Sequence, residues 1–271
     1  MGYAFKFAYE GTKFTGFQKG NGERSVEDTV TRRLTASGID VMIKSAARTD
    51  RGVSAMSNVM YIDSGEKPEK LAGIINAGGD DIMFHSYAEV NEEFRPRHCD
   101  MKVYRYILPA EVAGRPAFIK ILRKFEGTHD FSNFSRSDGR NPIRSVDKIN
   151  ARKYWDIVYV DFYGQSFLWN QIRSMIAFAD QFSQVDQATD PFKLGERFPG
   201  LADPRHLILM DIFYKEISFV PLHLKRYSRK TARELLLTES RLEFVRFLNS
   251  IVNESREEFS YPFNQMRDHH K

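Results

Sequence analysis

The sequence is poor in cysteine and has no long hydrophobic run. Its 271 residues include one cysteine, Cys99, so no disulfide can form within a chain, and we expect a protein of the reducing cytoplasm. No apolar stretch approaches the length of a membrane span. The first residues, Met1-Gly2-Tyr3, lack the layout of a signal peptide. We therefore expect neither secretion nor an association with membranes.

Several catalytic signatures are also missing. No Gly-x-Ser-x-Gly segment occurs, which gives little support to a serine hydrolase. The segment Gly11–Gln18 has two glycines around four residues, but the Lys-Ser/Thr pair of a phosphate loop does not follow them. The histidines show no metal-ligand spacing with the lone cysteine, so we expect no metal site. His129 and Asp130 are interpreted as the cap of a short helical turn, with a hydrolase site as a weaker alternative.

The composition indicates a folded protein with a preference for polyanions. Hydrophobic residues make up 42% of the chain and aromatic residues 13%, which argues against the disordered and fibrous classes. The formal net charge is +4. This mild excess of cations favours a negatively charged partner such as nucleic acid.

Hydrophobic periodicity predicts two similar rounds of strands and helices, which is typical of an α+β fold with an antiparallel sheet and helices on one side. The first helix is expected between the capping residue Ser25 and Gly38. The other elements predicted for the first round are strands at 3–9, 41–47, 57–63 and 82–90 and a helix at 67–76. Those predicted for the second round are strands at 101–108, 144–153, 156–163 and 207–213 and a helix at 166–182.

Regular structure is interrupted at Arg95-Pro96-Arg97, which is the best candidate for a domain boundary. We expect one domain at 1–98, a second at 99–216 and a helical extension at 217–271. Five basic side chains near the start of that extension either face solvent or follow a nucleic-acid backbone: Lys225, Arg226, Arg229, Lys230 and Arg233.

The most informative segment is Ala46–Ala55. Asp50 lies between Arg48 and Arg51, beside a glycine that permits a tight turn. Two close cations favour the ionised carboxylate, which could then act as a nucleophile or a base. Taken alone, an aspartate between arginines is more commonly a surface ion pair or a turn cap.

Two further segments carry residues suited to binding RNA or an anion. Tyr104 and Tyr106 share a strand face with basic neighbours, which suits the stacking of bases but also describes an ordinary aromatic pair of a sheet core. Arg173 is the single cation of a strongly apolar helix. Such an arginine either extends to the surface or pairs with a buried anion.

The order of these segments resembles the TruA-type tRNA pseudouridine synthases, and the Ser54 and Ala47 positions are similar to archaeal members. The segments that carry the resemblance are Tyr9–Gln18, Ser25-Val26-Glu27, Ala47–Ala55, Lys102–Ile107, Phe125–Phe134, Phe167–Arg173 and Ala202–Tyr214.

The resemblance implies a fold of two similar ferredoxin-like or RRM-like α+β domains, whose mostly antiparallel sheets join around a central cleft. It implies that Asp50 is the catalytic aspartate, that Arg173 pairs with it, and that Tyr104 stacks on the target base and assists removal of the C5 proton. Arg48 and Arg51 would hold the distorted RNA backbone. No metal or small-molecule cofactor is implied.

The implied substrate is tRNA, bound by a homodimer. The target would be a uridine around positions 38–40 of the anticodon stem-loop, which must be flipped out of its stack to be reached. A non-catalytic tRNA-binding protein on the same scaffold is the main alternative.

Overall fold

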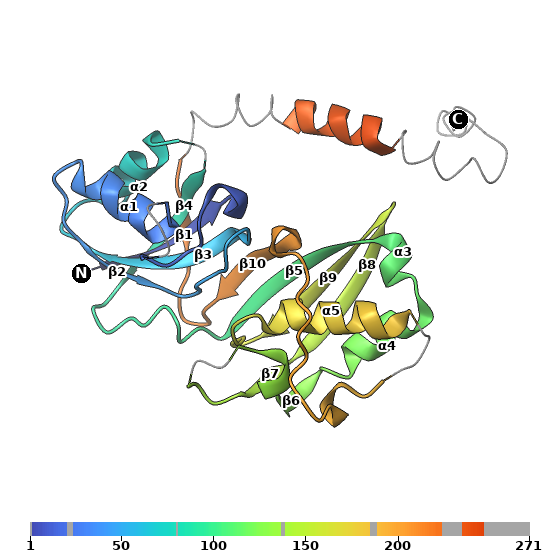
Figure 1. Ribbon diagram of the computed structural model, residues 1–271. Helices are drawn as coiled ribbons and strands as arrows, with labels where there is room; N and C mark the ends of the chain where they lie inside the picture. The colour runs from blue at the N-terminus through green and yellow to red at the C-terminus, as the bar shows by residue number, and fades with distance from the viewer. Residues whose placement is uncertain are drawn as a thin grey trace, which may run out of the picture. The chain divides into compact units, whose positions relative to one another are not determined.

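Nine strands form one continuous sheet in the part of the chain that the computed structural model describes, residues 2–20, 24–79, 81–136, 139–184, 189–223 and 235–246 (Figure 1). These strands are β1 (Gly2–Tyr9), β2 (Met42–Ser45), β3 (Ser54–Asp63), β4 (Ile82–Val90), β5 (Met101–Pro109), β8 (Lys148–Tyr154), β9 (Ile157–Gly164), β10 (Leu207–Phe213) and β11 (Val220–Pro221). Their order is β11-β4-β1-β3-β10-β5-β9-β8, with β2 added beside β3. Among these pairings β3 and β10 are parallel and the rest are antiparallel. The predicted α+β class with a mostly antiparallel sheet is therefore confirmed.

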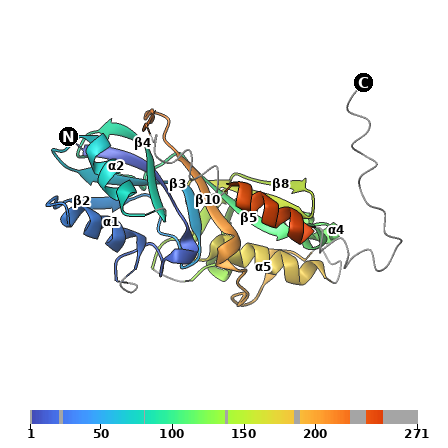
Figure 2. The ribbon, with the colours of Figure 1, turned by 90° about the horizontal axis from the view of Figure 1, so that it is seen from above.

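The helices form two groups, one for each half of the sheet. Helices α1 (Val26–Thr35) and α2 (Pro68–Ala77) lie beside β1, β3 and β4, whereas α4 (Pro116–Arg123) and α5 (Gln171–Ser183) lie beside β5, β8 and β9 (Figures 1 and 2). A short helix, α3 (Ala110–Ala113), follows β5. The remaining elements are the two-stranded sheet of β6 (Gly127–Asp130) and β7 (Ile143–Val146) and the 3-10 turns η1 (Gly11–Lys13), η2 (Ser132–Phe134), η3 (Pro191–Lys193) and η4 (Pro204–His206).

The strand register continues one buried face across the middle of the sheet. Tyr9 lies opposite Ala55, Ala55 opposite Leu209, Leu209 opposite Tyr104, and Tyr104 opposite Phe162. Residues that face one another across paired strands point to the same side of a sheet. All five are buried, so the apolar cores of the two halves meet at the β3–β10 pairing.

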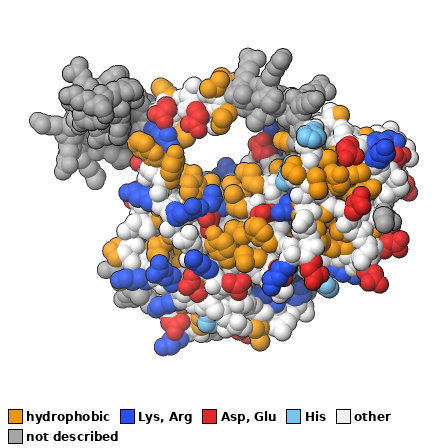
Figure 3. Space-filling model, turned by 180° about the vertical axis from the view of Figure 1, so that it is seen from behind, with side chains coloured by type: hydrophobic (Ala, Val, Ile, Leu, Met, Phe, Trp, Pro, Cys, Tyr) orange, Lys and Arg blue, Asp and Glu red, His pale blue; other side chains and the backbone are white. Residues whose placement is uncertain are grey.

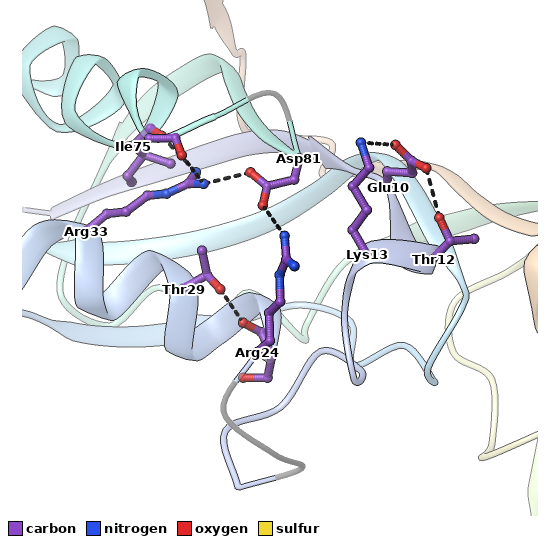
Figure 4. Close-up of polar contacts among 10 residues, drawn as sticks. Glu10, Thr12, Lys13, Arg24, Thr29, Arg33, Ile75 and Asp81 are labelled. Atoms are coloured by element: carbon purple, nitrogen blue, oxygen red, sulfur yellow. Dashed lines mark hydrogen bonds and ion pairs between the residues drawn. The ribbon is translucent and has the colours of Figure 1, made fainter.

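Two ion pairs with Asp81 hold helix α1 and the residue just before its N-cap (Figure 4). Arg33 of α1 donates to the carbonyl oxygen of Ile75 at 2.9 Å and to Asp81 Oδ1 at 2.6 Å. Arg24, just before α1, lies 3.6 Å from the second oxygen of Asp81. Burial alone would raise the pKa of Asp81, but the hydrogen bond and charge of Arg33 bring the pKa below its usual value. These contacts join α1 to the end of α2 and the start of β4.

Most predicted elements are present, and three differences have clear causes. Helix α5 begins at Gln171 rather than 166, because Asn170 adopts a left-handed backbone with φ of 68° that a helix cannot include. The strand predicted at 144–153 is two strands, β7 and β8, which pair with different partners on either side of Asp147. Helices α3 and α4 and strand β6 were not predicted, since each has only four to eight residues.

The C-terminal region is a separate unit, 223–271. Within it, residues 235–246 are helical, as the sequence pattern predicts. The five basic residues at 225–233 lie outside the described residues. In the described part of the chain, no helix is long and apolar enough to cross a bilayer.

Candidate active site

Asp50 lies in the tight connection between β2 and β3. The backbone N–H of Val53 donates to the Asp50 carbonyl oxygen at 3.2 Å, and Gly52 has a φ of 88°, which suits a residue without a Cβ atom. The Asp50 side chain is 27% exposed, so its carboxylate is partly withdrawn from water and still accessible. Its ion pair is with Arg173, whose Nη1 lies 3.1 Å from Asp50 Oδ2.

The glycine-bracketed segment after β1 packs on this connection. The Gly11 N–H donates to Ser54 Oγ at 3.0 Å, and the Phe17 N–H donates to the Thr49 carbonyl oxygen at 3.1 Å. A Cβ atom on Gly11 would lie 2.1 Å from the carbonyl oxygen of Val53, so no larger residue fits. The first segment of the resemblance thus supports the residues on both sides of Asp50.

Buried polar groups hold the same connection from the sheet. The hydroxyl of Tyr9 lies 2.8 Å from Thr49 Oγ1. Asn58, which is fully buried, donates to the Ala47 carbonyl oxygen at 2.9 Å and to the Tyr9 hydroxyl at 3.4 Å. Burial raises the pKa of Tyr9 well above its ordinary value, and the hydrogen bonds to Thr49 and Asn58 offset only part of this. Sequence reasoning missed Thr49 and Asn58, although the polar Asn58 in the middle of an apolar strand was a signal.

Arg173 lies in the first turn of α5 and is held on three sides. Its Nη1 donates to Asn170 Oδ1 at 3.1 Å as well as to Asp50, and its Nε donates to the Ala202 carbonyl oxygen at 2.7 Å. The Ala202 N–H donates back to the Arg173 carbonyl oxygen at 3.1 Å. Of the two alternatives for this arginine, the structure has the one in which it pairs with an anion. These contacts restrict the guanidinium to one orientation.

Tyr104 lies on the buried sheet face and its ring meets Phe167 edge-on, with the centroids 5.4 Å apart. Burial raises the pKa of Tyr104 far above its ordinary value, and the nearby Tyr9 and Asp50 contribute in the same direction. Because the charge of Asp50 raises the pKa of Tyr104, the two side chains are close enough to interact electrostatically. Tyr104 is a neutral phenol at physiological pH, as an ordinary tyrosine is, and its raised pKa extends that neutrality further into alkaline pH.

The two arginines beside Asp50 in the sequence have a different setting. Arg48 and Arg51 are exposed, and within the described residues neither forms an ion pair with Asp50. Arg97, from the Arg95-Pro96-Arg97 segment, lies near Arg48: burial, followed by the charges of Arg48 and Arg140, lowers the pKa of Arg97. Cations therefore gather beside the connection that carries Asp50.

The remaining candidates form no catalytic arrangement in the described residues. The His129 Nε2 atom donates to the Glu126 carbonyl oxygen at 2.8 Å, and the Asp130 carboxylate accepts from the Ser132 backbone N–H at 2.8 Å. The two residues end strand β6 rather than cap a helical turn, since the N-cap of η2 is Phe131, although the Asp130 side chain does bind the first N–H of η2. No serine–histidine–aspartate relay is assembled there. The described residues also contain no group of three His, Cys, Asp or Glu side chains placed to hold a metal.

Comparison with known proteins identifies the class. Residues 121–215 match the family described as tRNA pseudouridine synthase. The tRNA pseudouridine synthase A of Thermoplasma acidophilum is 49% identical over 217 residues, which are 80% of this chain and 85% of that protein. The proteins of the same name from Thermoplasma volcanium and Pyrococcus furiosus are 43% and 36% identical over 90% and 89% of this chain, and 96% and 94% of their own lengths. The chain belongs to the tRNA pseudouridine synthase A family.

One solved structure, "Crystal Structure of a Cbf5-Nop10-Gar1 Complex", aligns with a TM-score of 0.40 and 13% identity, covering 78% of this chain and 50% of that chain. A similarity at that level carries no argument about this protein.

Proposed function

We propose that this protein isomerises uridine to pseudouridine in tRNA, with Asp50 as the group that bonds transiently to the target nucleotide. The observation that carries the proposal is the ion pair between the half-buried carboxylate of Asp50 and the immobilised guanidinium of Arg173. Arg173 holds the carboxylate in one position, from which an oxygen atom can attack the nucleotide.

The reaction is an internal exchange of bonds. The glycosidic bond from N1 to C1′ breaks, the uracil turns, C5 bonds to C1′, and the proton on C5 is lost while N1 gains one. No electrons are gained or lost overall, so a nucleophile and proton transfers are sufficient. Attack of Asp50 on C6 of the base or on C1′ of the ribose would each satisfy this scheme.

In this proposal Tyr104 stacks against the target base as a neutral phenol. Its raised pKa makes the phenolate scarce, so any part in removing the C5 proton is a transfer through the hydroxyl group rather than abstraction by a free phenolate. Arg48 and Arg51, on the exposed side of the connection, would bind phosphates of the distorted backbone. Flipping the uridine costs a few kcal/mol of stacking, which these contacts would offset.

The experiment that tests the proposal follows tritium release from tRNA labelled at C5 of uracil. Wild type should release tritium, whereas Asp50→Asn should bind tRNA with similar affinity and release none. Asp63→Asn changes an exposed carboxylate at the far end of β3, the strand that follows Asp50; it is the matched control and should behave like wild type. A binding protein without catalysis would release no tritium in any form, which would refute the proposal.

The finer features of the function belong to the same proposal. We infer a target around positions 38–40 in the anticodon stem-loop, where a base must leave its stack before it can react. Mapping pseudouridines in tRNA from cells that lack the protein tests this. We also infer a cytoplasmic location, which fractionation of cells that contain the protein tests.

We also propose a homodimer and a division into domains at 1–98 and 99–216, around a central cleft, with the extension at 217–271. Hydrophobic side chains gather on the face seen in Figure 3, beside lysine and arginine side chains, and such a surface is compatible with a partner subunit. Sedimentation equilibrium of the free protein tests the dimer, and limited proteolysis tests the boundaries.

A further inference from the structure

The turn that leads into α5 has one side chain without a role in the site described above. Phe167 meets Tyr104, Leu168 is buried, and Asn170 accepts a hydrogen bond from Arg173. Trp169, between them, is 39% exposed. A single exposed aromatic side chain is common on a protein surface, so its exposure alone carries no argument. Its neighbours in the chain, which contact Tyr104 and Arg173, make Trp169 relevant to the site.

Trp169 is held in place by Arg136. The Arg136 guanidinium lies over the indole ring, 4.2 Å from its centroid. The backbone N–H of Arg136 donates to the Trp169 carbonyl oxygen at 3.0 Å. Arg136 is itself exposed. The pair therefore presents an exposed aromatic ring with a cation over one of its faces, which suits a ligand that has both a flat ring and an anionic group.

The residue that follows Trp169 also contacts the arginine that pairs with Asp50. The Asn170 side chain, adjacent to Trp169 in the chain, binds the same Nη1 atom of Arg173 that pairs with Asp50. A ligand on Trp169 would thus be held one residue along the chain from the contacts that position Asp50. When a base is flipped, its neighbour in the strand loses a stacking partner, and a nearby aromatic face can replace it.

We propose that Trp169 and Arg136 form a binding site for the unpaired nucleotide next to the flipped uridine, with its base stacked on the indole and its phosphate on the guanidinium. This inference rests on the proposed function, because it takes RNA as the substrate. The cations around Asp50, including Arg48 and Arg97, favour such an anionic ligand over an apolar peptide.

Fluorescence gives a direct test, since the chain has only two tryptophans. The other, Trp155, is 68% exposed in the turn between β8 and β9, and Trp155→Phe leaves Trp169 as the sole indole. An unmodified tRNA transcript should quench the emission of Trp155→Phe, and an abasic residue beside the target uridine should abolish most of the quenching. Unchanged emission at a concentration where filter binding shows saturation would overturn the proposal.

Kinetics give an independent test. Trp169→Leu removes stacking, so KM for tRNA should rise about 5- to 30-fold, equivalent to about 1–2 kcal/mol, while kcat stays within about twofold. Trp169→Tyr keeps an aromatic face and should restore most of the affinity. A purely structural role would instead lower kcat and the melting temperature of Trp169→Leu without a selective effect on KM.

The contribution of Arg136 is tested by the salt dependence of tRNA binding. Arg136→Gln should reduce by about one the slope of log affinity against log salt concentration, because one phosphate contact is lost. An unchanged slope would remove the phosphate from the proposal. If wild type itself forms no pseudouridine while the quenching is observed, the proposed function fails and the nucleotide site remains.

Discussion

Arg173 Nη1 lies 3.1 Å from Asp50 Oδ2, although the two residues are 123 positions apart in the chain. The same nitrogen donates to Asn170 Oδ1, and Nε donates to the carbonyl oxygen of Ala202. The guanidinium therefore links α5, the segment before η4 and the connection that carries Asp50. A planar group with several donors is required for this, which a lysine cannot reproduce.

We expect Arg173→Lys to lower kcat by about 100-fold, because a single ammonium nitrogen cannot occupy the positions of both Nη1 and Nε, and small displacements of a reacting group have large effects on rate. Single-turnover measurements of pseudouridine formation will show the loss. The control is Arg115→Lys, which changes the ion pair between Arg115, at the start of α4, and Asp180 of α5. It should retain activity. Full activity of Arg173→Lys would contradict the positioning role.

Tyr104→Phe separates stacking from proton transfer. The phenyl ring preserves the stacking surface, so tRNA affinity should change less than about twofold. Removal of the hydroxyl should lower kcat by about 100-fold or more if it transfers a proton. Tyr106→Phe is the control, since that hydroxyl donates to the Asp203 carbonyl oxygen at 3.0 Å; it should cost about 1 kcal/mol of stability and leave kcat unchanged.

Gly11→Ala should disturb the connection at Asp50. Its Cβ atom would lie 2.1 Å from the Val53 carbonyl oxygen, and relief of this overlap should lower the free energy of unfolding by about 1–3 kcal/mol and reduce activity. Gly73→Ala lies in the exposed interior of α2 with open space around it, and should raise the free energy of unfolding by about 0.5–1 kcal/mol. Urea denaturation compares the two variants, and equal stabilities would refute the packing argument.

Stability should decline at alkaline pH. Burial raises the pKa of Tyr106 to about 12 from 10.0, and it also raises the pKa of Tyr9, Tyr104 and Tyr214. A raised pKa in the folded state contributes stability that is complete below the unfolded pKa of about 10 and is lost as the pH rises through the folded value. Urea midpoints measured at increasing pH should therefore fall above about pH 10, and fall less steeply for Tyr106→Phe. Tyrosinate absorbance that develops fully near pH 10 in the folded protein would contradict this.

The sequence alone determined most of the elements and the principal candidate. Period-2 alternation in strands and the Ser25 cap of α1 are local features, and the structure contains both; Ser25 Oγ accepts from the Asp28 N–H at 3.0 Å. Asp50 was recognisable because charged neighbours and a glycine turn are visible in a short segment. The start of α5 was missed, because asparagine tolerates the left-handed backbone found at Asn170 but does not require it, so the sequence alone does not mark the break.

Tertiary structure decided which charges meet. Neither Arg48 nor Arg51 forms the ion pair with Asp50 in the described residues; Arg173 does, from the opposite half of the sheet. That contact depends on the parallel pairing of β3 with β10, which aligns Ala55 with Leu209 and thereby the two cores. Sequence periodicity assigns a side chain to a face of its own strand, but the register between distant strands follows from packing of the whole core. The raised pKa of Tyr104 has the same origin, since its main cause is burial by segments distant in the chain.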